Sequence, residues 1–225
     1  MTENQFTFKR VAPIFFLVLV DVLGLSIILP LIHLYAARFN ASPLEIGLVV
    51  AAFPLAQLGG VPMMGAVSYR FGRKPLLLIS QVTTCLCFIL LGAANTLWLV
   101  IASRVLDGTF GANLSTAQAA LSDISDEENR SRALGLTGAA FGVGFVLGPI
   151  ISVVSLNFSD SLAIPAYIAA AYSALSIILT IFLFEETLDP ENRSESARKA
   201  VSPVKAIQML QDGRVRLLLV MMFAQ

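Results

Sequence analysis

Six long apolar stretches constrain the fold of this chain more than any other feature of its sequence. They cover residues 11–36, 44–67, 75–94, 97–121, 133–156 and 162–184. An α-helix rises about 1.5 Å per residue, so roughly 20 apolar residues cross the hydrocarbon core of a bilayer, which is about 30 Å thick. A helix on a soluble core would interrupt such a stretch with polar residues every few positions. The sequence therefore predicts an all-α polytopic membrane protein with six spans.

The composition agrees with this interpretation. The chain is 56% hydrophobic and 13% charged, whereas soluble domains average about 45–50% apolar and about 25% charged residues. A net charge of zero gives no support for nucleic-acid binding. Cys85 and Cys87 lie within an apolar stretch and are interpreted as small helix residues. We find no phosphate-binding loop, metal-ligand cluster or nucleophile arrangement, so we predict neither an enzyme nor a metal site.

Basic residues indicate which side of the membrane each connection occupies. We place the N-terminus and every second connection on one side. That side then holds Lys9, Arg10, Arg70, Arg73, Lys74, Arg130, Arg132 and a cluster after residue 184, whereas the other side holds Arg38. Cytoplasmic connections are enriched in Lys and Arg. We therefore expect a multi-pass protein of the plasma or inner membrane with a cytoplasmic N-terminus.

A change in composition after the sixth span divides the chain into three parts. Residues 1–184 are predicted to form a transmembrane bundle, and the charged, turn-rich residues 185–213 a cytoplasmic linker. Residues 214–225 begin another apolar run that is too short to cross a bilayer. We interpret this last part as the start of a seventh span.

Two segments of the chain resemble each other at an offset of 88 residues. Residues 46–53 (IGLVVAAF) and 134–141 (LGLTGAAF) share five of eight residues. The first segment lies in a span that runs inward and the second in a span that runs outward, so the match is inverted. This pattern favours the 3+3 inverted repeat that secondary transporters use.

Several polar residues lie within the predicted spans, where they are costly. Asp21 is near the middle of the first span, and an Asp there costs roughly 2.5–3.5 kcal/mol on insertion scales. We favour a carboxylate that lines a wet cavity and takes up a proton or a cation over one merely satisfied by a neighbouring helix. Arg104 and Asp107 are close enough along one helix to pair, either as a structural ion pair or as one that changes with protonation. The remaining candidates for lining a pathway are Gln57, Asn113 and Gln118, each of which would alternatively form an interhelical hydrogen bond.

The fifth span is rich in glycine on two opposite faces. At 100° per residue, Gly138 and Gly142 lie near one face, while Gly144 and Gly148 lie near the other. Small residues allow helix backbones to approach closely in lipid, and Pro149 adds a kink. We predict a helix that is packed on both sides and that seals a pathway or bends during a transport cycle.

Four motifs together resemble a known family. Residues 65–74 read GAVSYRFGRK, residues 104–111 read RVLDGTFG, and residues 138–149 read GAAFGVGFVLGP. The first span adds Asp21-Val-Leu-Gly24 with Pro30. On these motifs the chain resembles the N-terminal half of a major facilitator superfamily transporter. Within that superfamily it resembles the twelve-span drug:proton antiporters typified by tetracycline efflux proteins, over essentially its whole length.

The resemblance implies roles for particular residues. It links Arg104, with Asp107, to proton coupling and Asp21 to substrate or proton handling. It assigns a cytoplasmic gating turn to Gly65, Tyr69, Arg70, Gly72, Arg73 and Lys74, with Asp123 as their acidic partner. It also assigns an antiporter motif, which favours export over import, to Gly138, Gly142, Gly144, Gly148 and Pro149.

Two positions depart from the family pattern. The gating turn usually carries Asp where this chain has Tyr69, and that carboxylate helps to lock one state of the transporter. The antiporter motif usually continues Gly-Pro-x-x-Gly-Gly, whereas this chain has Ser152 and Val153 at the last two positions. These departures place the usual gating contact and the packing at the outer end of the fifth span in question.

The resemblance implies proton-driven export of small, drug-like molecules by alternating access. The expected partners are a small-molecule substrate, protons, the lipid bilayer and a C-terminal six-span half, with no cofactor other than the proton gradient. A facilitator or symporter would share the gating turn without needing the antiporter motif. A non-transporting sensor or scaffold would account for Tyr69, and a half-size product would need a partner half.

Overall fold

The structure is a computed structural model that describes residues 8–158 and 161–188, all of whose regular elements are helical. The helices are α1 (Phe8–Ile28), η1 (Leu29–Leu31), α2 (Ile32–Arg38), α3 (Pro43–Phe71), α4 (Arg73–Gly92), α5 (Leu97–Phe110), α6 (Asn113–Asp123), α7 (Glu127–Phe158) and α8 (Ala163–Leu183). The predicted all-α fold is confirmed. Most of the predicted linker and the whole predicted start of a seventh span lie outside the described residues.

Local sequence explains where the long helices begin and end. Helix α3 starts at a capping box, in which Ser42 and Glu45 satisfy each other's backbone amides. It ends at Gly72, whose φ of 105° is strained for residues with a side chain. The first span bends through a short 3₁₀ turn at Pro30, where proline removes a backbone donor.

The fourth predicted span differs from the sequence-based expectation. We predicted one continuous helix over residues 97–121, but the chain breaks after Phe110 and resumes as α6 at Asn113. Within the described residues, five helical segments are individually long and apolar enough to cross a membrane: Val11–Arg38, Pro43–Phe71, Arg73–Gly92, Glu127–Asn157 and Ala163–Leu183. The continuous fourth span was therefore wrong, and α5 and α6 share that stretch.

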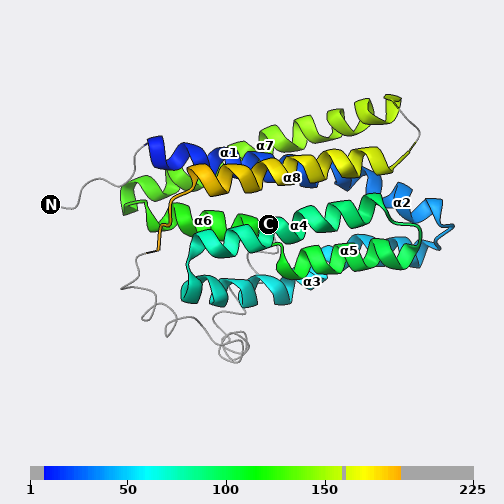
Figure 1. The fold of residues 1–225 in the computed structure, drawn as a ribbon, viewed down its shortest axis with the longest axis horizontal. Helices are drawn as coiled ribbons and strands as arrows, with labels where there is room; N and C mark the ends of the chain where they lie inside the picture. Colours follow the sequence, from blue (N-terminus) through cyan, green and yellow to red (C-terminus); the bar gives the residue numbers. More distant parts are fainter. Residues whose placement is uncertain (1–7, 159–160, 189–225) are drawn as a thin grey trace, which may run out of the picture.

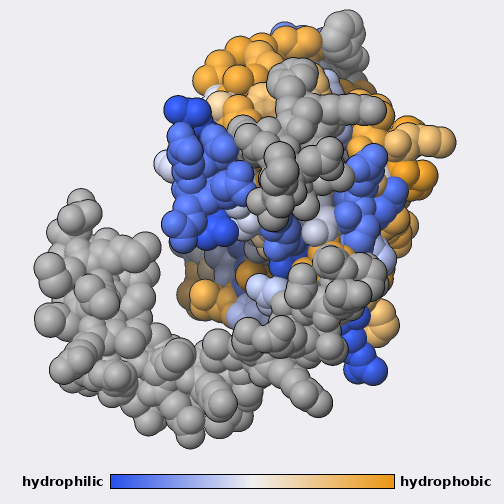
Figure 2. Space-filling model, turned by 90° about the vertical axis from the view of Figure 1, so that its left-hand side faces the viewer, coloured by the Kyte–Doolittle hydropathy of each residue, from blue (hydrophilic) through white to orange (hydrophobic). Residues whose placement is uncertain are grey.

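The helices lie side by side with their long axes roughly parallel, so the bundle is elongated (Figure 1). Figure 2 views the end of the bundle that carries the connections after Phe71 and Asp123. Hydrophilic residues gather on this end, whereas hydrophobic residues cover the flanks. The flanks expose large apolar side chains such as Leu58 and Phe182, which are 74% and 79% exposed. Such a surface suits lipid rather than water.

The helix pairs in contact follow the symmetry of an inverted repeat. Exchanging the first three spans with the last three maps the extensive α1–α7 contact onto the α3–α5 contact. It also maps α1–α8 onto the contacts of α4 with α5 and α6, and it maps α4–α8 onto itself. All of these contacts are present, so the packing agrees with the 3+3 arrangement indicated by residues 46–53 and 134–141.

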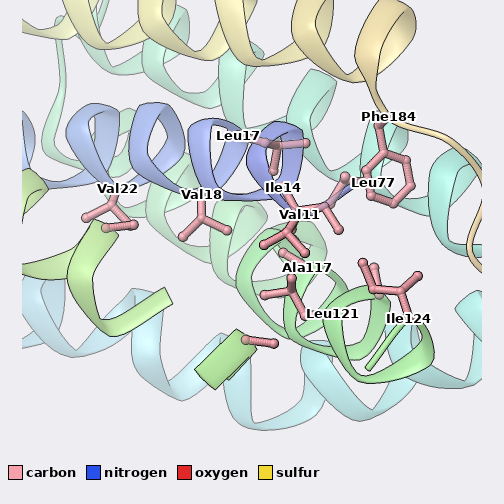
Figure 3. Close-up of a cluster of buried hydrophobic side chains, with 13 residues drawn as sticks. Val11, Ile14, Leu17, Val18, Val22, Leu77, Ala117, Leu121, Ile124 and Phe184 are labelled. Carbon is pink, nitrogen blue, oxygen red and sulfur yellow. The ribbon is translucent and has the colours of Figure 1, made fainter. Parts of the chain in front are cut away.

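A cluster of buried apolar side chains closes one end of the bundle. Figure 3 shows Val11, Ile14 and Leu17 of α1 close to Leu77 of α4 and to Phe184, which follows α8. Side chains of α6 and α7 complete the cluster. The cluster holds the ends of α4, α6 and α8 against α1 and so fixes the wall of the cavity described next.

Candidate functional site

A cavity of about 210 Å³ lies between the helices of the bundle, and every predicted span except the sixth contributes to its wall. Its lining residues are Leu17, Val18, Asp21, Val22, Leu25, Phe53, Gln57, Thr84, Phe88, Asp107, Gly111, Asn113, Leu114 and Phe141. Most of them are apolar, and the polar members include two carboxylates. A mostly apolar wall with a few polar groups is typical of small-molecule sites.

Asp21 and Asn113 form the polar centre of the cavity. The Asn113 amide nitrogen donates a hydrogen bond to Asp21 Oδ1 at 2.8 Å and a longer one to Thr84 Oγ1 at 3.4 Å. Asn113 is 5% exposed, and its Oδ1 has no hydrogen-bond partner among the described residues. A buried acceptor without a partner is costly, so this oxygen is available to a donor that enters the cavity.

Arg104 and Asp107 lie close together on α5, as their spacing predicted. The Arg104 Nη1 atom is 3.7 Å from Asp107 Oδ2, and both side chains are only 3% exposed. This separation is too long for a hydrogen bond, so the contact is one of opposite charges. Arg104 also lies over the Phe88 ring at 5.7 Å, and its Nε and Nη2 have no partner within the described part of the chain. Asp107 lines the cavity, whereas Arg104 is not among the lining residues.

The other predicted pathway residues divide between the cavity and the surrounding bundle. Gln57 lines the cavity together with Asp21, Asp107 and Asn113. Gln118 is only half-buried and is not among the lining residues. The structure thus brings most of these predicted residues together and leaves Gln118 outside the group.

Sequence reasoning did not find the aromatic wall residues or Thr84, nor the aliphatic side chains of the wall. Phe53 of α3, Phe88 of α4 and Phe141 of α7 lie in predominantly apolar stretches, where nothing in the sequence separates a cavity residue from its neighbours. Phe53 and Phe141 do hold equivalent positions in the two segments that match at an offset of 88 residues. This internal match was the one available indication that both rings face a common space.

The gating turn, residues 65–74, is organised around Arg73. The Arg73 Nε atom donates to Asp123 Oδ2 at 2.9 Å, and Nη1 donates to Ser68 Oγ at 2.8 Å. The guanidinium also lies over the Tyr69 ring, with Cζ 4.5 Å from the ring centroid. Tyr69 therefore contacts Arg73 through its ring face, as cation–π pairs do.

The remaining members of the turn have different surroundings. Gly72 supplies the positive φ, and its amide donates to Ser68 O at 2.9 Å. Lys74 Nζ donates to Ile181 O at the end of α8. Arg70 is exposed and lies beside the Phe71 ring, and a Cβ added at Gly65 would meet nothing within 4 Å.

Glu186 also contacts the turn, although the sequence placed it in the linker. Its carboxylate accepts hydrogen bonds from the backbone amides of Arg73 at 2.9 Å and Lys74 at 3.3 Å. A carboxylate at the start of a helix satisfies amides that have no partner within the helix. The nearby Leu188 is buried. Contacts with the bundle thus continue past residue 184.

The antiporter motif presents two different faces. A Cβ at Gly144 would lie 2.6 Å from Val22 of α1, and one at Gly148 would overlap the Ser26 side chain. Ser26 Oγ also donates to Gly144 O at 2.8 Å. By contrast, a Cβ at Gly138 or Gly142 would meet nothing within 4 Å. Among the described residues, α7 is therefore packed closely on one face only, and Pro149 is half-buried.

Comparison with known proteins decides the family. The family model described as Major Facilitator Superfamily matches residues 14–225. The chain belongs to the Major Facilitator Superfamily. Members of this superfamily are transporters that act on small molecules.

Curated relatives of this superfamily chain include drug-resistance proteins. The chain is 32% identical to the tetracycline resistance protein, class C, of Escherichia coli over 194 residues, which are 85% of this chain and 48% of that protein. It is 30% identical to the class H protein of Pasteurella multocida, covering 80% and 45%. It is 28% identical to multidrug resistance protein 2 of Bacillus subtilis (strain 168), covering 79% and 44%. The chain spans about half the length of these relatives.

A solved structure shows the same fold. The human organic anion transporter MFSD10 superposes with a TM-score of 0.71 at 22% sequence identity, covering 88% of this chain and 54% of that one. Together with the family match, this likeness in fold confirms the predicted six-span half of a superfamily transporter. Within the described residues, no group of three or more His, Cys, Asp or Glu side chains is placed to hold a metal ion.

Proposed function

We propose that this chain supplies the N-terminal half of a secondary active transporter that exports small molecules in exchange for protons. One observation carries the proposal: Asp21 and Asp107 line the same cavity, whose described lining contains no Lys, Arg or His. Asp107 has the Arg104 cation 3.7 Å away, whereas the hydrogen bond that Asp21 accepts comes from the neutral Asn113 amide. A carboxylate in a low-dielectric wall is poorly solvated, and a second carboxylate nearby repels it. Such a site gains stability by taking up a proton or a cationic group, which is the exchange that coupled export requires.

The cavity supports alternating access with a second half of the transporter. No residue of α8 lines the cavity. The cavity volume of about 210 Å³ is also small for a drug-sized ligand. We infer that a C-terminal six-span half completes the site at the midplane and that the two halves rock about it. The names of the curated relatives favour drug-like substrates.

The polar end of the bundle supports a cytoplasmic gate. Arg73 joins α4 to Asp123 at the end of α6, and Glu186 joins the same turn to the segment after α8. We propose that these contacts hold the cytoplasmic ends of the spans together in one state of the cycle. The N-terminus would then be cytoplasmic, in agreement with the distribution of Lys and Arg.

Flux measurements on the complete gene product in proteoliposomes test the proposal. Pyranine inside the vesicles reports proton movement, and tetracycline and ethidium serve as probes under an imposed pH gradient. Antiport predicts that probe movement in one direction drives protons in the other. Probe and proton movement in the same direction would establish symport, and probe movement without protons would establish facilitation. If neither tetracycline nor ethidium moves and no proton movement accompanies them, drug export is contradicted.

A further inference from the structure

The break between α5 and α6 is a defined turn rather than a frayed helix end. Gly111 has φ −76° and ψ 66°, and the Ala112 amide donates to Phe110 O at 2.9 Å. These are the dihedral angles and the hydrogen bond of an inverse γ-turn. The turn interrupts the helical ladder in the middle of a predicted span, where backbone groups without partners are costly.

One side chain from another helix satisfies this turn. Ser80 of α4 is fully buried, and its hydroxyl donates to Phe110 O at 2.7 Å. The same hydroxyl accepts the Ala112 amide, also at 2.7 Å. A hydroxyl has one donor and two acceptor positions, so Ser80 bridges both ends of the turn at once. Ser80 is not among the residues that line the cavity.

The turn determines which residues share the cavity. Asn113 lies six positions after Asp107, so in a continuous helix their side chains would lie about 120° apart around the axis and about 9 Å apart along it. In the structure both line the same cavity, and Asn113 donates to Asp21. A Cβ at Gly111 would lie 3.2 Å from Asp107 Oδ1 and would overlap the Asp107 carbonyl oxygen. The turn therefore brings the backbone against Asp107 while it turns Asn113 toward Asp21.

We propose that Ser80 is a positioning residue for the carboxylate site. Its hydroxyl holds the inverse γ-turn at Gly111 and thereby keeps Asn113 against Asp21 and in the same cavity as Asp107. Without this hydroxyl, the Ala112 amide and Phe110 O keep only their hydrogen bond to each other among the described residues. Extending the helix through the turn gives both groups helical partners instead, which rotates Asn113 away from Asp21. The inference rests on the proposed function, because it treats the cavity as the coupling site.

Hydrogen exchange of the purified full-length gene product tests the turn itself. In Ser80→Ala, peptides that cover residues 108–116 should exchange at least 10-fold faster or slower than in the unmodified protein, because the Ala112 amide changes partner. Ser80→Thr keeps the hydroxyl and should restore the original rate. Ser103→Ala is the matched control, since Ser103 is equally buried but bonds only to Val100 O of its own helix. Unchanged exchange in Ser80→Ala would overturn the proposal.

An infrared measurement tests the positioning without requiring transport. The carboxyl band of Asp21, assigned by its loss in Asp21→Asn, should shift in Ser80→Ala and stay in place in Ser80→Thr and Ser103→Ala. Proton-coupled flux should fall at least five-fold in Ser80→Ala alone. Altered exchange with an unshifted band or with unchanged flux would overturn the positioning role. If the unmodified protein shows no flux, the proposed function fails, and exchange and the infrared band decide this inference separately.

Discussion

Asp21 is the residue on which the proposed coupling depends most directly. It is half-buried in the cavity and accepts a hydrogen bond from Asn113. Its cost of roughly 2.5–3.5 kcal/mol for insertion exceeds what a merely structural hydrogen bond returns, about 0.5–1.5 kcal/mol. A functional reason for keeping this carboxylate is therefore the simpler account.

Replacing Asp21 by Asn should abolish coupling and leave the bundle intact. Asparagine has nearly the same shape and still accepts the hydrogen bond from Asn113, but it cannot take up a proton. We expect proton-coupled flux to fall at least 10-fold in Asp21→Asn, with unchanged yield in the membrane fraction. Asp126→Asn, at an exposed acid between α6 and α7, is the control and should retain flux. Coupled export at the original rate in Asp21→Asn would refute the role.

Tyr69 replaces the usual Asp of the gating turn with a contact of different chemistry. The centroid of its ring lies 4.5 Å from Arg73 Cζ, while Asp123 and Ser68 accept hydrogen bonds from the same guanidinium. Tyr69→Asp should change the transport rate, because a second carboxylate would compete with Asp123 for Arg73. A cation–π contact is worth about 0.5–1 kcal/mol at such sites, so the expected change is about two- to five-fold. Tyr69→Phe keeps the ring and should transport normally; equal rates in all three proteins would contradict a gating role.

At the scale of elements, the break in the fourth span is the feature that the sequence did not predict. Residues 97–121 form one apolar stretch, and the two glycines near its middle are no more frequent than those of the intact α7. The break depends on Ser80, which lies about 30 positions earlier on another helix. No local pattern contains that contact. The bend at Pro30, by contrast, follows from one residue's own geometry.

The α1–α7 crossing offers a test with a control inside the same helix. Gly148→Ala places a methyl group on the Ser26 side chain, whereas Gly142→Ala extends into open space. Overpacking of this kind costs about 1–3 kcal/mol. We expect Gly148→Ala to lower the thermal unfolding temperature of the protein in detergent by several degrees. Gly142→Ala should leave that temperature unchanged, and equal stability of the two variants would show that the close approach of α1 and α7 is not needed.

At the scale of the whole molecule, the lengths of the spans could be predicted from the sequence. The face that each helix turns toward the interior of the bundle could not. The apolar stretches set the lengths of α3, α4 and α8 within about four residues at each end, whereas α7 begins at Glu127, before its apolar stretch at 133–156. Lipid is as apolar as a protein interior, so hydrophobicity does not separate the two environments. Leu58 is 74% exposed and Leu77 is fully buried, although both are leucines in neighbouring spans. Helix packing therefore decides which apolar residues line the cavity. Only the charged and amide residues of the wall could be predicted from the sequence.

The inverted repeat accounts for both close helix crossings of the bundle. Gly144 and Gly148 let α7 approach α1, and Gly60 and Gly108 let α3 approach α5. The two crossings are equivalent under exchange of the first and last three spans. Each crossing brings a carboxylate to the cavity, Asp21 on α1 and Asp107 on α5. The packing of the two triplets of spans thus brings one acid from each triplet to the same cavity.

The same arrangement predicts the sidedness of the chain in the membrane. The connection at Asn95 and the connection at Asp126 lie at opposite ends of the α5–α6 stretch, and both residues are exposed. In a background without Cys85 and Cys87, Asn95→Cys should react with a membrane-impermeant maleimide added to intact cells. Asp126→Cys should react only after permeabilisation, because the Lys and Arg residues near it favour the cytoplasm. The reverse pattern of labelling would place the gating turn outside the cell and would exclude its proposed role as a cytoplasmic gate.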